Sequence, residues 1–282
     1  MATLIQAESI SEAWLKSLEF TNAQQNGKAV HLLTSVADPS RPEDPQIRSA
    51  VDRILTPTTK RASVQSVDTI ANTIFPISLY PDPGISWSSE SSTDSSLVES
   101  AAEKLYSNYA TIFSNLQKAH RENTKGTYFS RMISWPGKTM NGYNQLEKRL
   151  QHLRGKKADR VTAFNASDMA LTEPGGDSSE INIYAVSDHR VRSFPCLVHI
   201  DIGVFAGKVN LLGVYRHQML IQKGYGNLIG LARLQKFIAQ QSGYGLGELA
   251  VQATFACAEQ QFFTKRGVNE LVATKLQGAF EI

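Results

Sequence analysis

The stretch from Phe194 to Gln241 constrains the fold more than any other part of the chain. Phe194 to Phe205 is a continuous strand-like run, Ala206-Gly207-Lys208 is a turn, and a second strand-like run extends from Val209 to His217. This pattern predicts an antiparallel hairpin. Asn227 to Gln241 then changes to a 3.6-residue apolar period, which predicts a helix. A hairpin followed by a helix suits the α/β (α+β) class, as does a single domain of 282 residues.

Other apolar patterns predict further elements along the chain. Helical spacing covers 10–25, 47–55, 97–121 and 144–154, and also 64–79 as far as Pro76, which tends to end a helix. Strands are expected at 29–36 and 160–165, and the run 249–263 fits a buried helix or a strand followed by a helix. Serine fills seven positions from Ser86 to Ser96, which predicts a surface loop or insertion at about 84–100. No linker divides the chain, so we expect one domain over 1–282.

Composition and short motifs exclude several classes of protein. The net charge is 29 − 26 = +3, which is too small to predict nucleic-acid binding. No apolar stretch approaches the ~18 residues of a membrane-spanning helix, and the first residues lack the pattern of a signal peptide. We therefore expect a soluble, cytoplasmic protein. Two cysteines and six histidines without paired ligand spacing predict no metal site.

Cys196 has two competing interpretations. It follows Pro195 at the start of an apolar strand, where a cysteine is commonly a core residue. However, Arg216 lies on the partner strand of the predicted hairpin, and Arg190 and Arg192 precede the cysteine. Guanidinium groups lower the pKa of a nearby thiol, and they can hold a phosphate through two hydrogen bonds. A nucleophile beside an anion site is therefore the alternative to a core thiol.

From Pro195 to Glu259 the chain resembles thymidylate synthase and the related pyrimidine hydroxymethylases. The resemblance is collinear and rests on Pro195-Cys196 at the nucleophile, Gly207-Lys208 at the hairpin turn, Arg216 at the phosphate-binding arginine and Asn227 at the base-binding asparagine. Upstream it continues through Ala13-Trp14, Trp135, Asn144-Gln145-Leu146 and Val161 to Asn165. The resemblance implies a large bent mixed sheet flanked by helices, in a homodimer that packs sheet to sheet.

The resemblance also implies a chemistry and a set of site residues. The Cys196 thiolate would add to C6 of a pyrimidine mononucleotide, so that C5 attacks a one-carbon group carried by a folate. Around this nucleophile the resemblance places a phosphate site, a base-reading amide and two carboxylates that could supply a proton. The residues for the phosphate are Arg216, His217, Lys157 and Arg160, of which Lys157 and Arg160 would reach the phosphate of the other subunit. Asn227 would bind the base, and Asp201 or Glu259 would supply the proton.

Several positions depart from the family pattern. Met219 occupies the position of the folate-contacting Asp, Asn72 that of the catalytic Glu, and Cys257 and Glu259 those of the His and Tyr that hold the ribose. The sequence also stops at Ile282 without the family's long tail. Three functions therefore remain open: a pyrimidine C5 transferase, a catalytically degenerate nucleotide-binding or regulatory homologue, and a structural or assembly subunit.

Overall fold

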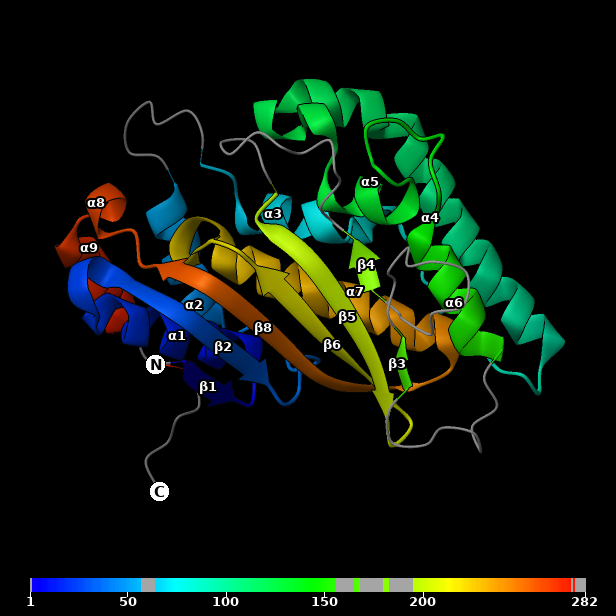
Figure 1. Ribbon diagram of the computed structural model, residues 1–282, viewed down its shortest axis with the longest axis horizontal. Helices are drawn as coiled ribbons and strands as arrows, with labels where there is room; N and C mark the ends of the chain where they lie inside the picture. The colour runs from blue at the N-terminus through cyan, green and yellow to red at the C-terminus, as the bar shows by residue number, and fades with distance from the viewer. Residues whose placement is uncertain are drawn as a thin grey trace.

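The computed structural model describes residues 2–56, 64–155, 165–167, 180–182, 195–274 and 276. These residues form a mixed α/β fold around an eight-stranded sheet with the order β1-β2-β8-β6-β5-β3, in which β4 also pairs with β5 and β7 with β8 (Figure 1). The strands are β1 (Thr3–Ala7), β2 (Lys28–Val36), β3 (Asn165–Ser167), β4 (Glu180–Asn182), β5 (Leu197–Phe205), β6 (Lys208–Tyr215), β7 (Gln218–Met219) and β8 (Gly245–Cys257).

The sheet combines parallel and antiparallel pairs. β5 and β6 form the predicted antiparallel hairpin, whereas β6 and β8 are parallel because helix α7 connects them. Along β6, Val209, Leu211 and Tyr215 are buried and alternate with the half-buried Leu212 and Val214. This alternation means that one face of the sheet supports the core and the other is only partly covered.

Helices cover one face of the sheet (Figure 1). They are α1 (Ile10–Ala23), α2 (Pro45–Leu55), α3 (Val67–Ile74), α4 (Ser92–Ala119), α5 (Tyr128–Ile133), α6 (Gln145–Gly155), α7 (Tyr225–Ser242), α8 (Gln260–Phe263) and α9 (Lys265–Val272). Short helical turns are η1 (Gln25–Gly27), η2 (Ile77–Leu79), η3 (Arg121–Lys125) and the π-helical η5 (Leu220–Gly224).

Helix α7 is the central helix of this layer. Its Gln235 side chain donates a hydrogen bond of 2.8 Å to the carbonyl of Val209, which ties the helix to β6. On its other side α3 packs very closely, because a Cβ placed on Gly226 would lie 2.7 Å from Ile70 Cβ. The helix ends at Gly243, whose φ of 74° is the left-handed cap that its glycine predicts. The backbone of α7 is therefore held from both sides.

The structure corrects one expectation about local structure and adds a strand that was not predicted. The serine-rich stretch is not a loop throughout, because Ser91 caps the long helix α4, which begins at Ser92. The edge strand β1 was not predicted, since its residues are mostly half-exposed and show little apolar signal. The strand expected at 160–165 lies outside the described residues except for Asn165, and the run 249–263 proves to be a strand followed by a short helix.

Candidate functional site

The ends of the β5–β6 hairpin opposite its turn bring Cys196 and Arg216 together. The backbone N–H of Arg216 donates to the carbonyl of Cys196 at 2.9 Å. The guanidinium Nε of Arg216 donates to the carbonyl of Pro195 at 3.0 Å. The hairpin register therefore fixes the predicted anion-binding arginine beside the predicted nucleophile, and the second contact orients its guanidinium group.

The charges around Cys196 do not favour its thiolate in the ligand-free chain. Burial raises the pKa of Cys196, and this effect exceeds the opposing influence of Arg216 and Lys223, while Glu122 adds to it. Lys223 is itself occupied, since its ammonium lies 3.0 Å from the Glu122 carboxylate and 2.9 Å from Gln65 Oε1. The expectation that nearby arginines lower the pKa of this thiol is therefore outweighed by desolvation.

Two tyrosines, the half-buried Tyr128 and the buried Tyr215, lie next to this cysteine. Tyr128 of α5 accepts a hydrogen bond of 3.4 Å from the backbone N–H of Leu197. Tyr215, the register partner of Leu197 on β6, is fully buried, and its hydroxyl has no hydrogen-bond partner in the described part of the chain. Burial raises the pKa of both tyrosines, and the negative form of Cys196 would raise each further. Both hydroxyls are therefore protonated at neutral pH.

Asn227 lies in the first turn of α7 and is only 4% exposed. One turn later, Leu231 contacts the sheet, since a Cβ on Gly213 would lie 2.8 Å from its Cδ1. Asn227 therefore belongs to the end of α7 that lies over the Tyr215 end of β6. Among the described hydrogen bonds none involves its side-chain amide. A nearly buried amide without such a bond is a candidate for ligand recognition.

His217 forms a flat surface beside Arg216. Its ring stacks on Phe255 with 5.2 Å between centroids and an interplanar angle of 22°, and Lys28 Nζ lies 6.0 Å from the same Phe255 ring. Burial lowers the pKa of His217, and the charges of Arg216 and Lys28 lower it further. The arrangement places positive charge at this end of the hairpin, as an anion site requires.

Glu259 binds the backbone instead of facing Cys196. Its Oε2 accepts hydrogen bonds from the N–H groups of Ile221 at 2.7 Å and Gln222 at 3.0 Å. Its Oε1 is buried with no partner among the described residues, and burial raises the pKa of the carboxyl group. The carboxylate therefore holds η5 in place, and the role of Glu259 as a proton donor stays a prediction.

Asp201, the second predicted proton donor, is not brought to Cys196. Asp201 lies within β5 opposite Leu212 of β6, about 15 Å along the strand from Cys196. It corrects the second candidate proton donor, since the extended strand separates the two side chains. Lys157 and Arg160 lie outside the described residues.

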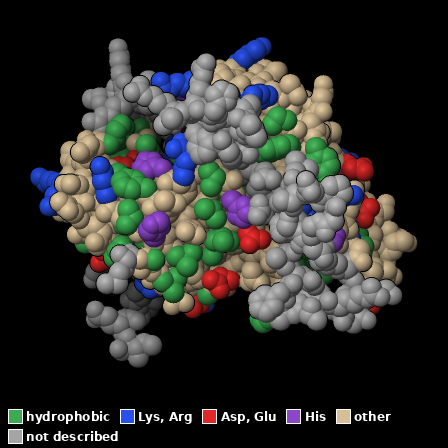
Figure 2. Space-filling model, viewed as in Figure 1, with side chains coloured by type: hydrophobic (Ala, Val, Ile, Leu, Met, Phe, Trp, Pro, Cys, Tyr) green, Lys and Arg blue, Asp and Glu red, His purple; other side chains and the backbone are tan. Residues whose placement is uncertain are grey.

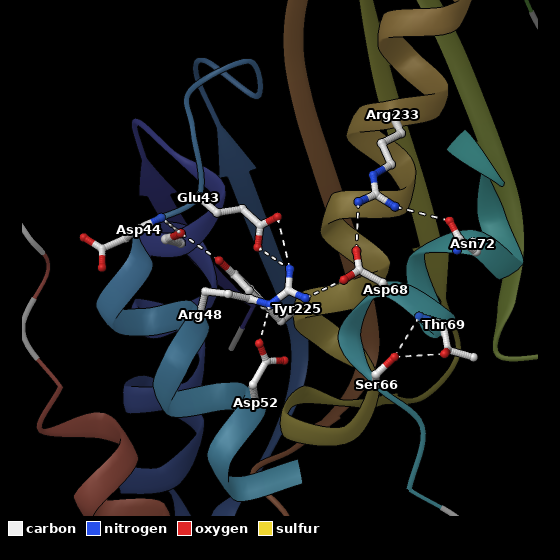
Figure 3. Close-up of polar contacts among 11 residues, drawn as sticks. Glu43, Asp44, Arg48, Asp52, Ser66, Asp68, Thr69, Asn72, Tyr225 and Arg233 are labelled. Atoms are coloured by element: carbon white, nitrogen blue, oxygen red, sulfur yellow. Dashed lines mark hydrogen bonds and ion pairs between the residues drawn. The ribbon is translucent and has the colours of Figure 1, made fainter. Parts of the chain in front are cut away.

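Asn72 belongs to a polar network with Arg233 and Asp68 (Figure 3). Its side-chain oxygen accepts a hydrogen bond of 3.3 Å from Arg233, which also contacts Asp68 at 3.0 Å. Asp68 in turn contacts Arg48 of α2. These contacts join α2, α3 and α7. They engage the side chain of Asn72, the residue that the resemblance aligned with a catalytic Glu.

Sequence reasoning missed three residues beside Cys196: Tyr128, Tyr215 and Lys223. The inward position of Tyr215 follows from the alternation along β6, but no local signal in the sequence predicts that Tyr128 of α5 and Lys223 of η5 approach Cys196. The described residues contain no cluster of His, Cys, Asp and Glu that could hold a metal ion. No helix among them is long and apolar enough to cross a membrane.

Comparison with known proteins adds no relative. Neither the protein-family models nor the curated proteins contain a match to this chain. The resemblance to thymidylate synthase therefore stays a prediction from the collinear residues of the sequence.

Proposed function

We propose that the chain is a divergent thymidylate-synthase-like protein that binds a pyrimidine mononucleotide at the Cys196 end of the hairpin. One observation carries the proposal: the hairpin register places Arg216 beside Cys196, and the end of α7 nearby holds the unpaired amide of Asn227. A nucleophile, an anion-binding guanidinium and a base-reading amide are what this chemistry requires.

Each residue has a distinct role in the proposed complex. Arg216 binds the phosphate, and Lys28 and His217 extend the same surface. Asn227 reads the base, since an amide donates and accepts and so fits the edge of uracil. The bound phosphate would also oppose the positive charge that lowers the pKa of His217.

The proposed chemical step is addition of the Cys196 thiolate to C6. The S–C6 bond forms, the C5–C6 π pair moves toward C5 and the 4-carbonyl oxygen, and C5 takes a proton from water. Loss of the other C5 hydrogen and expulsion of the thiolate restore the nucleotide. Exchange of the C5 hydrogen with solvent therefore reports the nucleophile without any co-reactant.

A catalytically degenerate binding homologue is the second candidate. It is favoured by the raised pKa of Cys196 and by the structural use of Glu259 and Asn72. In this case the nucleotide binds through Arg216 and Asn227, and C5 exchange is absent.

The described residues do not fit a folate as the resemblance would place it. Met219, at the position of the folate-contacting Asp, is 38% exposed and offers only a thioether, which is a weak hydrogen-bond acceptor. We therefore assign no step to a folate.

We further propose that a second copy of the chain covers the open sheet face. Leu33, Leu212, Val214 and Ala250 are half-buried there and Val30 is 52% exposed. Figure 2 shows hydrophobic side chains gathered over β2, β8 and β6 on this face. An apolar sheet face of this kind is typical of a subunit interface.

Two measurements test the nucleotide proposal. Calorimetric titration with dUMP should detect binding, and Arg216→Ala should weaken it by roughly 1.5–3 kcal/mol, the range for a hydrogen bond to a charged group. Arg266→Ala, at a side chain 89% exposed, is the control and should bind as wild type does. Absence of dUMP binding would refute the proposal. Loss of C5 exchange in Cys196→Ser, with exchange in wild type, would distinguish the enzyme from the degenerate homologue.

A further inference from the structure

The hydroxyl of Tyr215 is a buried polar group that the fold leaves without a use. Its side chain is 0% exposed, and no described residue hydrogen-bonds its oxygen. A buried unpaired hydroxyl destabilises a folded protein. Two other buried tyrosine hydroxyls are satisfied: Tyr109 lies 2.6 Å from Thr127 Oγ1 and Tyr225 lies 2.9 Å from Ser11 Oγ. Thr21 Oγ1 is a second buried hydroxyl without a described partner, but among these three buried tyrosines Tyr215 is the exception, and its unpaired hydroxyl calls for an explanation.

The position of Tyr215 relates this hydroxyl to the nucleotide site. Tyr215 precedes Arg216 directly and lies opposite Leu197, the residue after Cys196. It shares the helix-facing side of β6 with Gly213, where α7 packs through Leu231. Its hydroxyl therefore lies in the layer between β6 and the end of α7.

Two polar side chains therefore belong to the same end of this layer. Asn227 begins α7 there, and Tyr215 ends β6 there. A uracil ring presents two carbonyl oxygens and one N–H along its edge. An amide satisfies one carbonyl and the N–H, which leaves one carbonyl without a partner.

We propose that Tyr215 donates its hydroxyl proton in a hydrogen bond to a ring carbonyl oxygen of the bound pyrimidine, and so acts as a base-specificity residue. This inference rests on the proposed function. It also explains why the unsatisfied hydroxyl is retained, because the ligand supplies the missing acceptor. Burial keeps the phenol protonated, which suits a donor.

Tyr215→Phe tests the proposal, since it removes only the oxygen. Without ligand the variant should melt a few degrees above wild type, because an unsatisfied group is gone. Its affinity for dUMP should fall about 3- to 10-fold, the loss expected for one neutral hydrogen bond. Tyr109→Phe is the matched control: it breaks a satisfied buried hydrogen bond, so it should melt lower and bind dUMP unchanged.

The outcomes separate this inference from the proposed function. Undiminished dUMP affinity in Tyr215→Phe, with weakened binding in Arg216→Ala, would overturn the role of Tyr215 alone. Absence of dUMP binding in wild type would overturn both proposals. Weaker binding in Tyr215→Phe together with a raised melting temperature would support the inference, because a merely structural hydroxyl cannot produce both effects.

Discussion

Replacing Glu259 should destabilise the segment that follows the hairpin. In Glu259→Ala the N–H groups of Ile221 and Gln222 lose the carboxylate oxygen that accepts both of their hydrogen bonds. A buried donor left unpaired costs about 1–3 kcal/mol, so the two together should cost ~2–4 kcal/mol once removal of the desolvated carboxylate is allowed for. Glu259→Gln keeps one acceptor oxygen in the same shape and should cost about 1 kcal/mol.

The same residue predicts a pH dependence with a defined sign. Burial raises the pKa of Glu259 in the folded chain above the ordinary value of a glutamate carboxyl group. Between the unfolded and folded pKa values, the folded state holds a proton that the unfolded state releases. The free energy of unfolding contributed by this group therefore falls as pH rises through that window. Glu259→Gln cannot titrate and should lack this contribution.

Urea unfolding at a series of pH values from 4 to 8 measures both effects. Glu19→Gln, at an exposed position of α1, is the control and should follow wild type within about 0.5 kcal/mol. The reasoning is refuted if Glu259→Ala is as stable as wild type. It is also refuted if the difference between wild type and Glu259→Gln does not change with pH, or changes with the opposite sign.

Three further predictions concern the assembly, the cofactor and a helix. Wild type should be a dimer by light scattering at micromolar concentration and Leu212→Glu a monomer, because the substitution puts a charge on the open sheet face; a monomeric wild type would contradict this. With Met219 in place of an acidic residue, the protein should not methylate dUMP with methylene-tetrahydrofolate, and rescue of a thymidylate-requiring strain would show otherwise. Ser91→Ala should cost about 1 kcal/mol, since Ser91 Oγ accepts from the N–H of Asp94 at 3.2 Å; an unchanged urea midpoint would count against that cap.

The hairpin and α7 could be predicted because their patterns record burial directly. Alternation along β6 reflects one covered face of the sheet, and the apolar residues of α7 reflect a helix buried between β6 and α3. The serine-rich stretch misled because serine is common both in loops and at helix N-caps, and only the fold shows that Ser91 is a cap. Composition alone does not distinguish these two uses.

The residues of the candidate site could be predicted to be neighbours only where the pairing register of the β5–β6 hairpin determines their positions. Cys196 and Arg216 are neighbours because a hairpin fixes which of its residues face each other. The contacts of Glu259 were not predicted because its partners lie on η5, and the path of that segment has no signature in the sequence. The burial that raises the pKa of Cys196 was also not predicted, because it depends on elements that are distant in the sequence.

Alkylation of Cys196 with and without nucleotide tests the central claim most directly. Iodoacetamide labelling is followed by mass spectrometry, with Cys257 as the internal reference. Because burial raises the pKa of Cys196, its labelling should be slow near neutral pH and should accelerate as pH rises. Saturating dUMP should slow the labelling of Cys196 at least about tenfold and should leave the labelling rate of Cys257 unchanged. At the same dUMP concentration, Cys196 of the Arg216→Ala variant should be protected from labelling much less. Equal labelling of Cys196 with and without dUMP would contradict the account.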